Sequence, residues 1–347
     1  MRLGVMPPFT PMEAKVHSEL PTGVGWQYEP KWDGFRAVAF RDGDEVVIHS
    51  RNQKPLTRYF PELVPALQSI LPKRVVLDGE IVIFTGSGTD FDAMTQRIHP
   101  AASRVNMLAA TEPSSYVAFD VLADGDESLL EYPLKQRRQR LEKLLGPSPE
   151  SIFLSPVTMD RETAIGWLKE FRGTGLDGIV AKKIDSTYKS GERAMVKVKE
   201  QRTADCVVGG FRWGMDGKRV GSILLGVYSG KNLVYLGHTS GFDNEERKAL
   251  VKMLEPFRGG PSFEGGRAPG GPSRWNQERE LEWEPLRPEL VCEVGYDRLE
   301  GDRFRHGVRF LRWRPDKDPK QCTLAQLKAE ASVELKSLFG KEPARRR

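Results

Sequence analysis

The chain has 347 residues, 39% hydrophobic and 29% charged, which predicts a soluble protein large enough for two domains. Its formal net charge of +5 is too small to identify a partner, and no apolar stretch approaches the length of a membrane span. Pro7 and Pro8 interrupt the N-terminus before an apolar signal-peptide region could form. Three widely spaced cysteines form no C-x-x-C pair, which argues against a zinc or redox motif and favours a cytoplasmic location.

The first part of the chain alternates predicted strands and helices. Alternating or continuous apolar residues predict strands, and helical spacing predicts two helices, the second capped by Asp160. The predicted strands are a hairpin over 37–49 around Asp42-Gly43-Asp44, a strand pair over 75–84, and single strands over 116–122, 178–183 and 194–199. The predicted helices cover 134–145 and 161–171.

After Lys199 the pattern changes. Short strands broken by glycines have the spacing of a small β-barrel, so we predict two domains, 1–200 and 201–347, with a hinge near 200–203. The elements expected in the second domain are strands within 206–236 and over 289–298 and 308–314, helices over 244–254 and 323–338, and a glycine-rich surface loop over 258–274.

Positive charge gathers in one short segment of this second domain. Residues 298–317 contain seven basic and three acidic side chains, a net charge of +4 and most of the excess of the whole chain. Phe304, Phe310 and Trp313 lie between the arginines, a composition that suits a polyanion. A solvated β-ribbon explains the segment equally well. The basic residues are Arg298, Arg303, Arg305, Arg309, Arg312, Arg314 and Lys317.

The hexapeptide from Lys31 to Arg36 has the form K-x-D-G-x-R, in which a lysine can carry a nucleotide covalently. Gly34 permits a tight turn that projects Lys31, and Arg36 stands where a flexible cation could reach phosphate. A lysine attacks only when it is neutral, so nearby cations or desolvation must lower the pKa of Lys31. The motif alone is suggestive, and other residues must grip the nucleoside and the phosphates.

Two lysines and two carboxylates further along the chain fit such a site. Lys197 and Lys199 alternate with apolar residues, so both are predicted to point to one face of a strand, although an exposed edge strand explains them without any function. Asp78 and Glu80 lie within an apolar run. A carboxylate buried there needs a partner, which could be a ribose hydroxyl, a metal ion or an arginine.

A second run of this kind begins at Asp177 and ends at Lys182. Carboxylates, together with water, commonly hold Mg²⁺ beside phosphates. Phe119 offers a ring on which a base could stack, although any core strand could contain a phenylalanine.

Several other chemistries lack their motifs. The sequence contains no G-x-x-x-x-G-K-[S/T] loop, no G-x-G-x-x-G that opens a helix and no G-x-S-x-G turn. The five histidines are scattered and have no metal-ligand spacing.

Taken in order, these residues resemble six motifs of the covalent nucleotidyltransferases, specifically of ATP-dependent DNA ligases of the short bacterial ligase C type. The resemblance covers roughly residues 5–320. It implies that Lys31 forms lysyl-AMP, Glu29 contacts the adenine amino group, Arg51 of Ser50-Arg51-Asn52 engages the ribose or the nick phosphate, and Glu80 binds ribose and assists the metal. It also implies that Phe119 and Val180 stack on the base, Asp177 holds the metal, Lys197 and Lys199 contact the α-phosphate with Arg36 and Lys182 as further cations, and Arg314-Pro315-Asp316-Lys317 orients pyrophosphate.

Two positions depart from the family pattern. Asp177 stands where glutamate is common, so the metal geometry is expected to shift, and Met195 replaces a tryptophan that often precedes the lysine pair.

The resemblance implies an α+β fold: a nucleotidyltransferase domain with ATP-grasp-like antiparallel sheets and helices, followed by an OB-fold β-barrel domain. It implies sealing of nicked double-stranded DNA with ATP, carried as covalent AMP, and Mg²⁺ or Mn²⁺. A monomer in the cytoplasm, associated with the nucleoid and with DNA-repair proteins as candidate partners, is expected. An mRNA-capping guanylyltransferase, an RNA ligase and a catalytically inactive DNA-binding scaffold are the alternatives.

Overall fold

The computed structural model describes the chain except for residues 87, 147–150, 172–173, 200–201, 262, 265–268, 270–281, 298, 302, 305–306, 328–334 and 341–347. The chain forms two compact units, Met1–Glu200 together with Glu330–Arg347, and Gln201–Ala329. The sequence predicted a single boundary with everything after it in the second domain. The C-terminal residues group instead with the first unit, because Leu335 and Leu338 are buried in its core.

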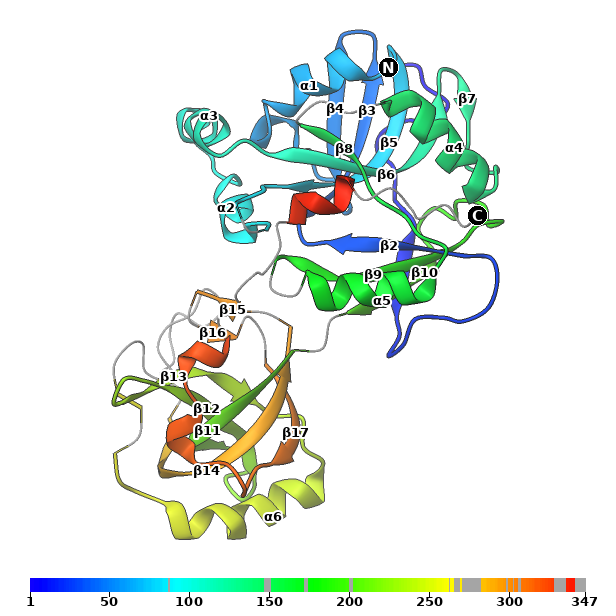
Figure 1. Ribbon diagram of the computed structural model, residues 1–347. Coiled ribbons are helices and arrows are strands. Elements are labelled where there is room, and N and C mark those ends of the chain that lie inside the picture. The colour runs from blue at the N-terminus through cyan, green and yellow to red at the C-terminus, as the bar shows by residue number, and fades with distance from the viewer. Residues whose placement is uncertain are drawn as a thin grey trace. The chain divides into compact units, whose positions relative to one another are not determined.

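One sheet of the first unit contains, in order, β4 (Glu45–Ser50), β3 (Phe35–Asp42), β5 (Arg74–Val82), β6 (Ser115–Asp124) and β7 (Glu127–Ser128), with β8 (Ile152–Leu154) parallel to β6 (Figure 1). Apolar residues of α1 (Leu63–Ile70), α2 (Phe91–Gln96) and α4 (Leu134–Leu145) pack on the same core as this sheet. Burial of these side chains is the main favourable term in the stability of the layer.

The second sheet of this unit has the order β1 (Glu13–Val16), β10 (Arg193–Lys199), β9 (Leu176–Lys183) and β2 (Trp26–Trp32). Helix α5 (Arg161–Glu170) covers it through Ala164 and Trp167, which share a core with Tyr28 and Ile179. The predicted cap is confirmed, because the Asp160 side chain accepts a hydrogen bond from the N–H of Thr163.

The second unit is built on a five-stranded antiparallel sheet with the order β13 (Asn232–Thr239), β12 (Val220–Ser229), β11 (Arg202–Trp213), β14 (Glu284–Tyr296) and β17 (Arg309–Trp313). Helix α6 (Asn244–Leu254) packs Leu250 and Leu254 into the same core. Its N-terminus carries a capping box between Asp243 and Glu246. A small hairpin, β15 (Leu299–Glu300) and β16 (Arg303–Phe304), lies apart from the sheet order.

Four predictions of local structure need correction or fall at least partly outside the described residues. Residues 75–84 form mainly one strand, β5, rather than a strand pair. The helix predicted over 323–338 is not continuous: its described parts are short 3₁₀ turns at Leu324–Leu327 and Leu335–Gly340. Much of the predicted 258–274 loop and half of the predicted hinge lie outside the described residues. Among the described residues, no helix combines the length and apolarity needed to cross a bilayer.

Candidate active site

Strand pairing places predicted site residues of β2, β9 and β10 side by side at two neighbouring positions of the register, each of which we call a row. Glu29 pairs with Val180, and Val180 pairs with Lys197. In the next row, Lys31 and Lys199 both pair with Gly178. Since alternate residues of a strand share a face, Glu29 and Lys31 project to the same side of the sheet. Lys197 and Lys199 are likewise alternate residues of β10, so they share a face, as the sequence predicted.

Two backbone features shape the row that contains Lys31. The register shifts between Lys31 and Trp32, which leaves Asp177 as the extra residue of a β-bulge opposite them. Gly178 has a φ of +151°, and a Cβ atom there would lie 2.2 Å from the carbonyl oxygen of Val198. Glycine therefore allows β10 to approach β9, and the bulge directs Asp177 toward Lys31.

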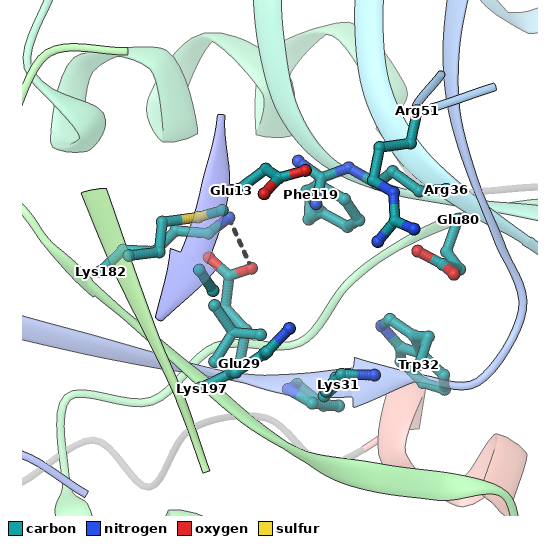
Figure 2. Close-up of a pocket in the computed structure, with 14 residues that line it drawn as sticks. Glu13, Glu29, Lys31, Trp32, Arg36, Arg51, Glu80, Phe119, Lys182 and Lys197 are labelled. Carbon is teal, nitrogen blue, oxygen red and sulfur yellow. Dashed lines mark ion pairs between the residues drawn. The ribbon is translucent and has the colours of Figure 1, made fainter. Parts of the chain in front are cut away.

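The other sheet supplies the opposite wall of the site. Arg36 on β3 pairs with Glu80 on β5, Phe119 lies on β6, and Arg51 follows β4. Gly34 belongs to the tight connection between the two walls, where a Cβ atom would lie 2.1 Å from the carbonyl oxygen of Ile81. Figure 2 shows the side chains of the two sheets facing one another across an opening.

Most of the predicted site residues line one pocket. It is lined by Glu13, Ala14, Glu29, Pro30, Lys31, Trp32, Arg36, Arg51, Glu80, Phe119, Val180, Lys182, Met195 and Lys197 (Figure 2). Asp177 adjoins it through its contact with Lys31. Arg314 and Lys317 belong to the second unit.

Lys31 forms an ion pair with Asp177, with 2.5 Å between Nζ and Oδ2. Burial alone lowers the pKa of Lys31, but the charge of Asp177 and its hydrogen bond outweigh this and raise the pKa above its ordinary value. The sequence reasoning required a lowered pKa for attack. The free protein instead holds Lys31 as an ammonium ion, so the Asp177 contact must be broken before the lysine can act as a nucleophile.

Lys197 has the opposite behaviour. Desolvation lowers the pKa of Lys197, and the nearby charges of Lys31, Lys199 and Arg51 lower it further. Lys197 thus belongs to a cluster of four cationic side chains, and the carboxylate of Glu13 opposes their effect on its pKa. Such a cluster is costly without an anion and suits a polyphosphate.

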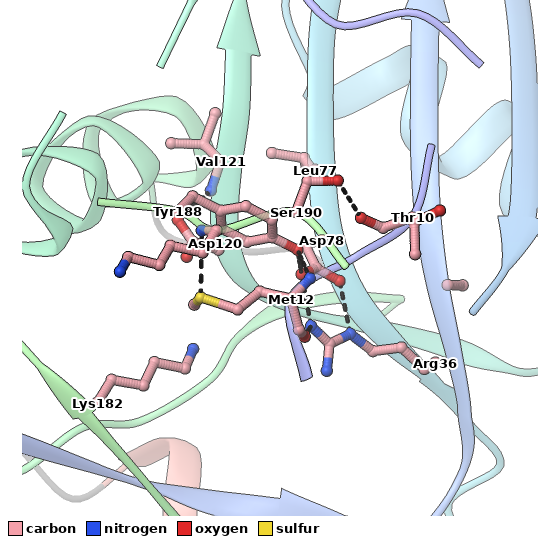
Figure 3. Close-up of polar contacts among 12 residues, drawn as sticks. Thr10, Met12, Arg36, Leu77, Asp78, Asp120, Val121, Lys182, Tyr188 and Ser190 are labelled. Carbon is pink, nitrogen blue, oxygen red and sulfur yellow. Dashed lines mark hydrogen bonds and ion pairs between the residues drawn. The ribbon is translucent and has the colours of Figure 1, made fainter. Parts of the chain in front are cut away.

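Arg36 differs from the flexible cation predicted from the sequence. Its Nε and Nη2 atoms both donate to the carboxylate of the fully buried Asp78, each at 2.6 Å, and Tyr188 donates to the same carboxylate at 2.6 Å (Figure 3). Desolvation would lower the pKa of Arg36, but Asp78 raises it overall. Among the partners considered for Asp78, the structure therefore selects an arginine, and this bidentate pair fixes Arg36 over the Phe119 ring, 4.6 Å from its centroid.

Glu29 is held at the other side of the pocket by two partners. Lys182 Nζ lies 2.8 Å from Oε2, and Gln27 Nε2 donates to Oε1 at 2.7 Å. All three side chains are buried, so these contacts satisfy a charge that would otherwise be expensive to bury. Lys182 also lies 4.7 Å from the centroid of the Phe119 ring, the ring on which a base is expected to stack.

Glu80 is the most perturbed carboxylate of the site. Burial raises its pKa to about 7, although Lys31 and Arg36 act in the opposite direction. Within the described residues, no group of three or more His, Cys, Asp or Glu side chains is arranged to hold a metal ion. Asp177 and Glu80 are oxygen donors of the kind that hard divalent cations prefer, and phosphate oxygens and water are the other ligands such ions commonly take beside nucleotides.

Sequence reasoning missed three residues of this region: Gln27, Tyr188 and Glu13. Gln27 was detectable in part, because a residue two positions before Glu29 on a strand shares its face. Tyr188 has no comparable signal, since its partner Asp78 lies 110 positions away. Glu13 enters the pocket because β1 pairs with β10, a contact between distant segments.

The remaining candidate residues lie in the second unit. Arg314 donates to Asp205 at 2.8 Å and to Asp316 at 2.9 Å, and Lys317 lies 3.7 Å from Asp205. The side-chain hydrogen bond to Asp316 raises the pKa of Arg314 and lowers that of Asp316 to about 2.

The structure describes only part of the basic segment over 298–317. Arg312 pairs with Glu293 at 2.7 Å and is 62% exposed, and Arg303 lies over the Tyr235 ring. Arg309 is exposed on β17, and Arg305 lies outside the described residues.

Comparison with known proteins identifies the family. A family model described as "ATP dependent DNA ligase domain" matches residues 11–199, and another described as "ATP dependent DNA ligase C terminal region" matches residues 216–317. The chain is 46% identical over 346 residues to DNA ligase C1 of Mycolicibacterium smegmatis, with 96% of this chain and 98% of that protein covered. It is 47% identical over 357 residues to DNA ligase C of Mycobacterium tuberculosis, with 97% and 99% covered.

A solved structure from a study of Lig E DNA ligases shares the fold, with a TM-score of 0.55, 19% identity, and coverage of 88% of this chain and 99% of that one. The predicted α+β architecture, a nucleotidyltransferase domain followed by an OB-fold domain, is confirmed. The chain therefore belongs to the ATP-dependent DNA ligases and is one of their short bacterial type.

Proposed function

We propose that this ligase seals 5′-phosphate/3′-hydroxyl nicks in duplex DNA through a lysyl-AMP intermediate on Lys31. The observation that carries the proposal is the position of Lys31 in a pocket whose lining also contains the cations Arg51 and Lys197, the carboxylate of Glu29 and the ring of Phe119. The cations suit phosphates, and the carboxylate and the ring suit a purine that offers an amino group.

In the first step, the neutral Nζ of Lys31 attacks the α-phosphorus of ATP. A phosphoramidate bond forms, the bond to pyrophosphate breaks, and a proton of the attacking nitrogen passes to solvent. An oxygen of the 5′-phosphate at the nick then attacks the phosphorus of AMP, which breaks its bond to Nζ and returns a proton to the lysine. The 3′-hydroxyl finally attacks the 5′-phosphate and loses its proton, AMP leaves, and the phosphodiester forms. Each step depends mainly on positioning and charge neutralisation. A divalent cation, Mg²⁺ or Mn²⁺, bound by Asp177 and Glu80 would neutralise phosphate charge.

The roles of the surrounding side chains follow from their chemistry. Glu29, held in place by Lys182 and Gln27, accepts a hydrogen bond from the adenine amino group, and Phe119 and Val180 contact the base. Glu80 accepts a bond from a ribose hydroxyl. Charge that develops on the phosphates is stabilised by Arg36, Arg51 and Lys197 of the pocket lining. Lys199, which follows Lys197 on the same face of β10, adds a further cation.

The second unit contributes to two stages in this proposal. Arg314 and Lys317 orient the departing pyrophosphate during lysine adenylation. Arg303, Arg309 and Arg312, together with Arg305, contact DNA phosphates without reading sequence, which makes DNA binding salt-dependent. We further propose that the enzyme acts as a monomer in DNA repair, in the cytoplasm near the nucleoid and with repair proteins as partners.

The test is sealing of a 5′-phosphorylated nicked duplex with ATP or GTP by the wild type and Lys31→Ala. We expect sealing with ATP alone and loss of both sealing and the protein–AMP adduct in the variant. Sealing by Lys31→Ala would refute the nucleophile. A stable adduct with sealing of nicked RNA but not nicked DNA would refute the proposed acceptor.

A further inference from the structure

The C-terminal turn Leu335–Gly340 belongs to the first unit, although in the sequence it comes after the whole second unit, Gln201–Ala329. Leu335 and Leu338 are each only 1% exposed and join the core that contains Trp32, Tyr28 and Phe171. Burial of two leucines in this core favours the docked state of the turn. The turn is therefore an integral part of the unit that holds Lys31.

Phe339 completes an aromatic cluster at this docking site. Its ring stacks on Trp32, with centroids 5.2 Å apart and an interplanar angle of 3°, and on Phe153, with centroids 4.5 Å apart. It meets the edge of Phe84 at 5.9 Å. Trp32 and Phe84 also contact each other edge to face. These geometries are the favourable arrangements for aromatic pairs.

Trp32 connects this cluster to the nucleophile. It follows Lys31 on β2, lines the nucleotide pocket and is only 3% exposed. The β-bulge interrupts regular pairing between Lys31 and Trp32, so the ladder alone does not define this part of the backbone. Three contacts hold the Trp32 ring: a 3.0 Å hydrogen bond from Nε1 to Ser155 Oγ, the edge-to-face contact with Phe84, and the stack on Phe339.

We propose that Phe339 is a positioning residue for lysine adenylation, which acts through Trp32 to hold Lys31 in line with the α-phosphate. The proposal rests on the proposed role of Lys31. The first chemical step would then depend on a segment that follows the second unit in the sequence. Pocket geometry must be held within a fraction of an ångström for such a displacement, so loss of one wall of the Trp32 site is expected to slow it.

The experiment compares wild type, Phe339→Ala and Phe339→Tyr in the full-length chain, with Lys169→Ala as a control. Lys169 is an exposed residue of α5, a helix that packs on the same core as the turn. Two single-turnover rates are measured for each protein: lysyl-AMP formation over a range of ATP concentrations, and sealing of a chemically pre-adenylated nick, which bypasses lysine adenylation. Thermal unfolding of each variant is recorded in parallel.

We expect Phe339→Ala to slow lysyl-AMP formation about tenfold at saturating ATP, with the ATP concentration for half-maximal rate and the sealing of pre-adenylated DNA changed less than about twofold. Phe339→Tyr should have the wild-type first rate, because the ring stack is kept, and Lys169→Ala should match the wild type. Equal loss of both rates, or an unchanged first rate in Phe339→Ala, would overturn the positioning role. Adduct formation by Lys31→Ala, tested beside them, would instead overturn the proposed nucleophile.

Discussion

At the scale of single residues, the pocket places like charges close together at a cost to the free protein. The pKa of Lys197 is lowered by desolvation and by Lys31, Lys199 and Arg51, which means that its charged form is less stable in the folded than in the unfolded chain. Active sites commonly contain such destabilising groups, because function and not stability selects them. A substitution that removes the charge of Lys197 is therefore expected to raise stability and to lower activity.

We predict that Lys197→Met stabilises the protein at pH 7 by up to about 1 kcal/mol, a figure limited by solvent screening, while slowing nick sealing at least about 100-fold. Because the folded-state pKa is lowered, the stabilisation is full below that pKa and fades as the pH rises through 10.5, the ordinary value, above which wild-type Lys197 is neutral in both states. Urea unfolding at pH 7 and above pH 10 measures it. Lys169→Met, on the exposed side of α5, is the control, and a less stable Lys197→Met at pH 7 would contradict the argument.

At the scale of elements, the site depends on how closely β9 and β10 approach each other. Gly178 lies between Lys31 and Lys199 in the register and has a φ of +151°. A Cβ atom at this position would lie 2.2 Å from the carbonyl oxygen of Val198, so there is no room for a side chain. Separation of these strands would move both lysines of the K-x-K pair away from Lys31.

Gly178→Ala is therefore predicted to destabilise the protein by about 2–3 kcal/mol and to lower lysyl-AMP formation in the fraction that remains folded. Gly166→Ala is the matched control: it lies inside α5, where a Cβ atom meets nothing within 4 Å, and should stabilise by about 0.5–1 kcal/mol. Urea denaturation gives both values. A Gly178→Ala protein as stable as the wild type would show that β10 can shift without loss.

The elements that sequence reasoning predicted well are those specified by neighbouring residues. Helix α4 has the predicted bounds, and α5 begins after its predicted cap, because spacing and capping are local properties. The contacts that it missed join distant segments: β1 with β10, Tyr188 with Asp78, and the C-terminal turn with Trp32. Motif order could name the candidate residues of the pocket, but only the folded chain reveals that Arg36 and Lys31 are engaged by carboxylates.

At the scale of the whole molecule, the two units have separate hydrophobic cores and carry different candidate charges. Arg312 and Arg314 are two positions apart at the end of β17, yet their surroundings differ. Arg312 is 62% exposed and pairs with Glu293, whereas Arg314 is 17% exposed and is held by Asp205 and Asp316. An exposed arginine suits a long DNA backbone, and an oriented, half-buried guanidinium suits one small phosphate group.

We therefore predict opposite effects for two neighbouring substitutions. Arg314→Ala should slow lysyl-AMP formation about 100-fold and leave sealing of a pre-adenylated nick nearly unchanged, because pyrophosphate departs only in the first step. Arg312→Ala should leave lysyl-AMP formation unchanged, weaken DNA binding, and reduce the slope of log K against log salt by about 1, as expected for one lost phosphate contact. Adenylation assays and DNA binding at several salt concentrations measure both. If each variant impaired lysyl-AMP formation and DNA binding equally, the separate roles proposed for Arg312 and Arg314 would be wrong.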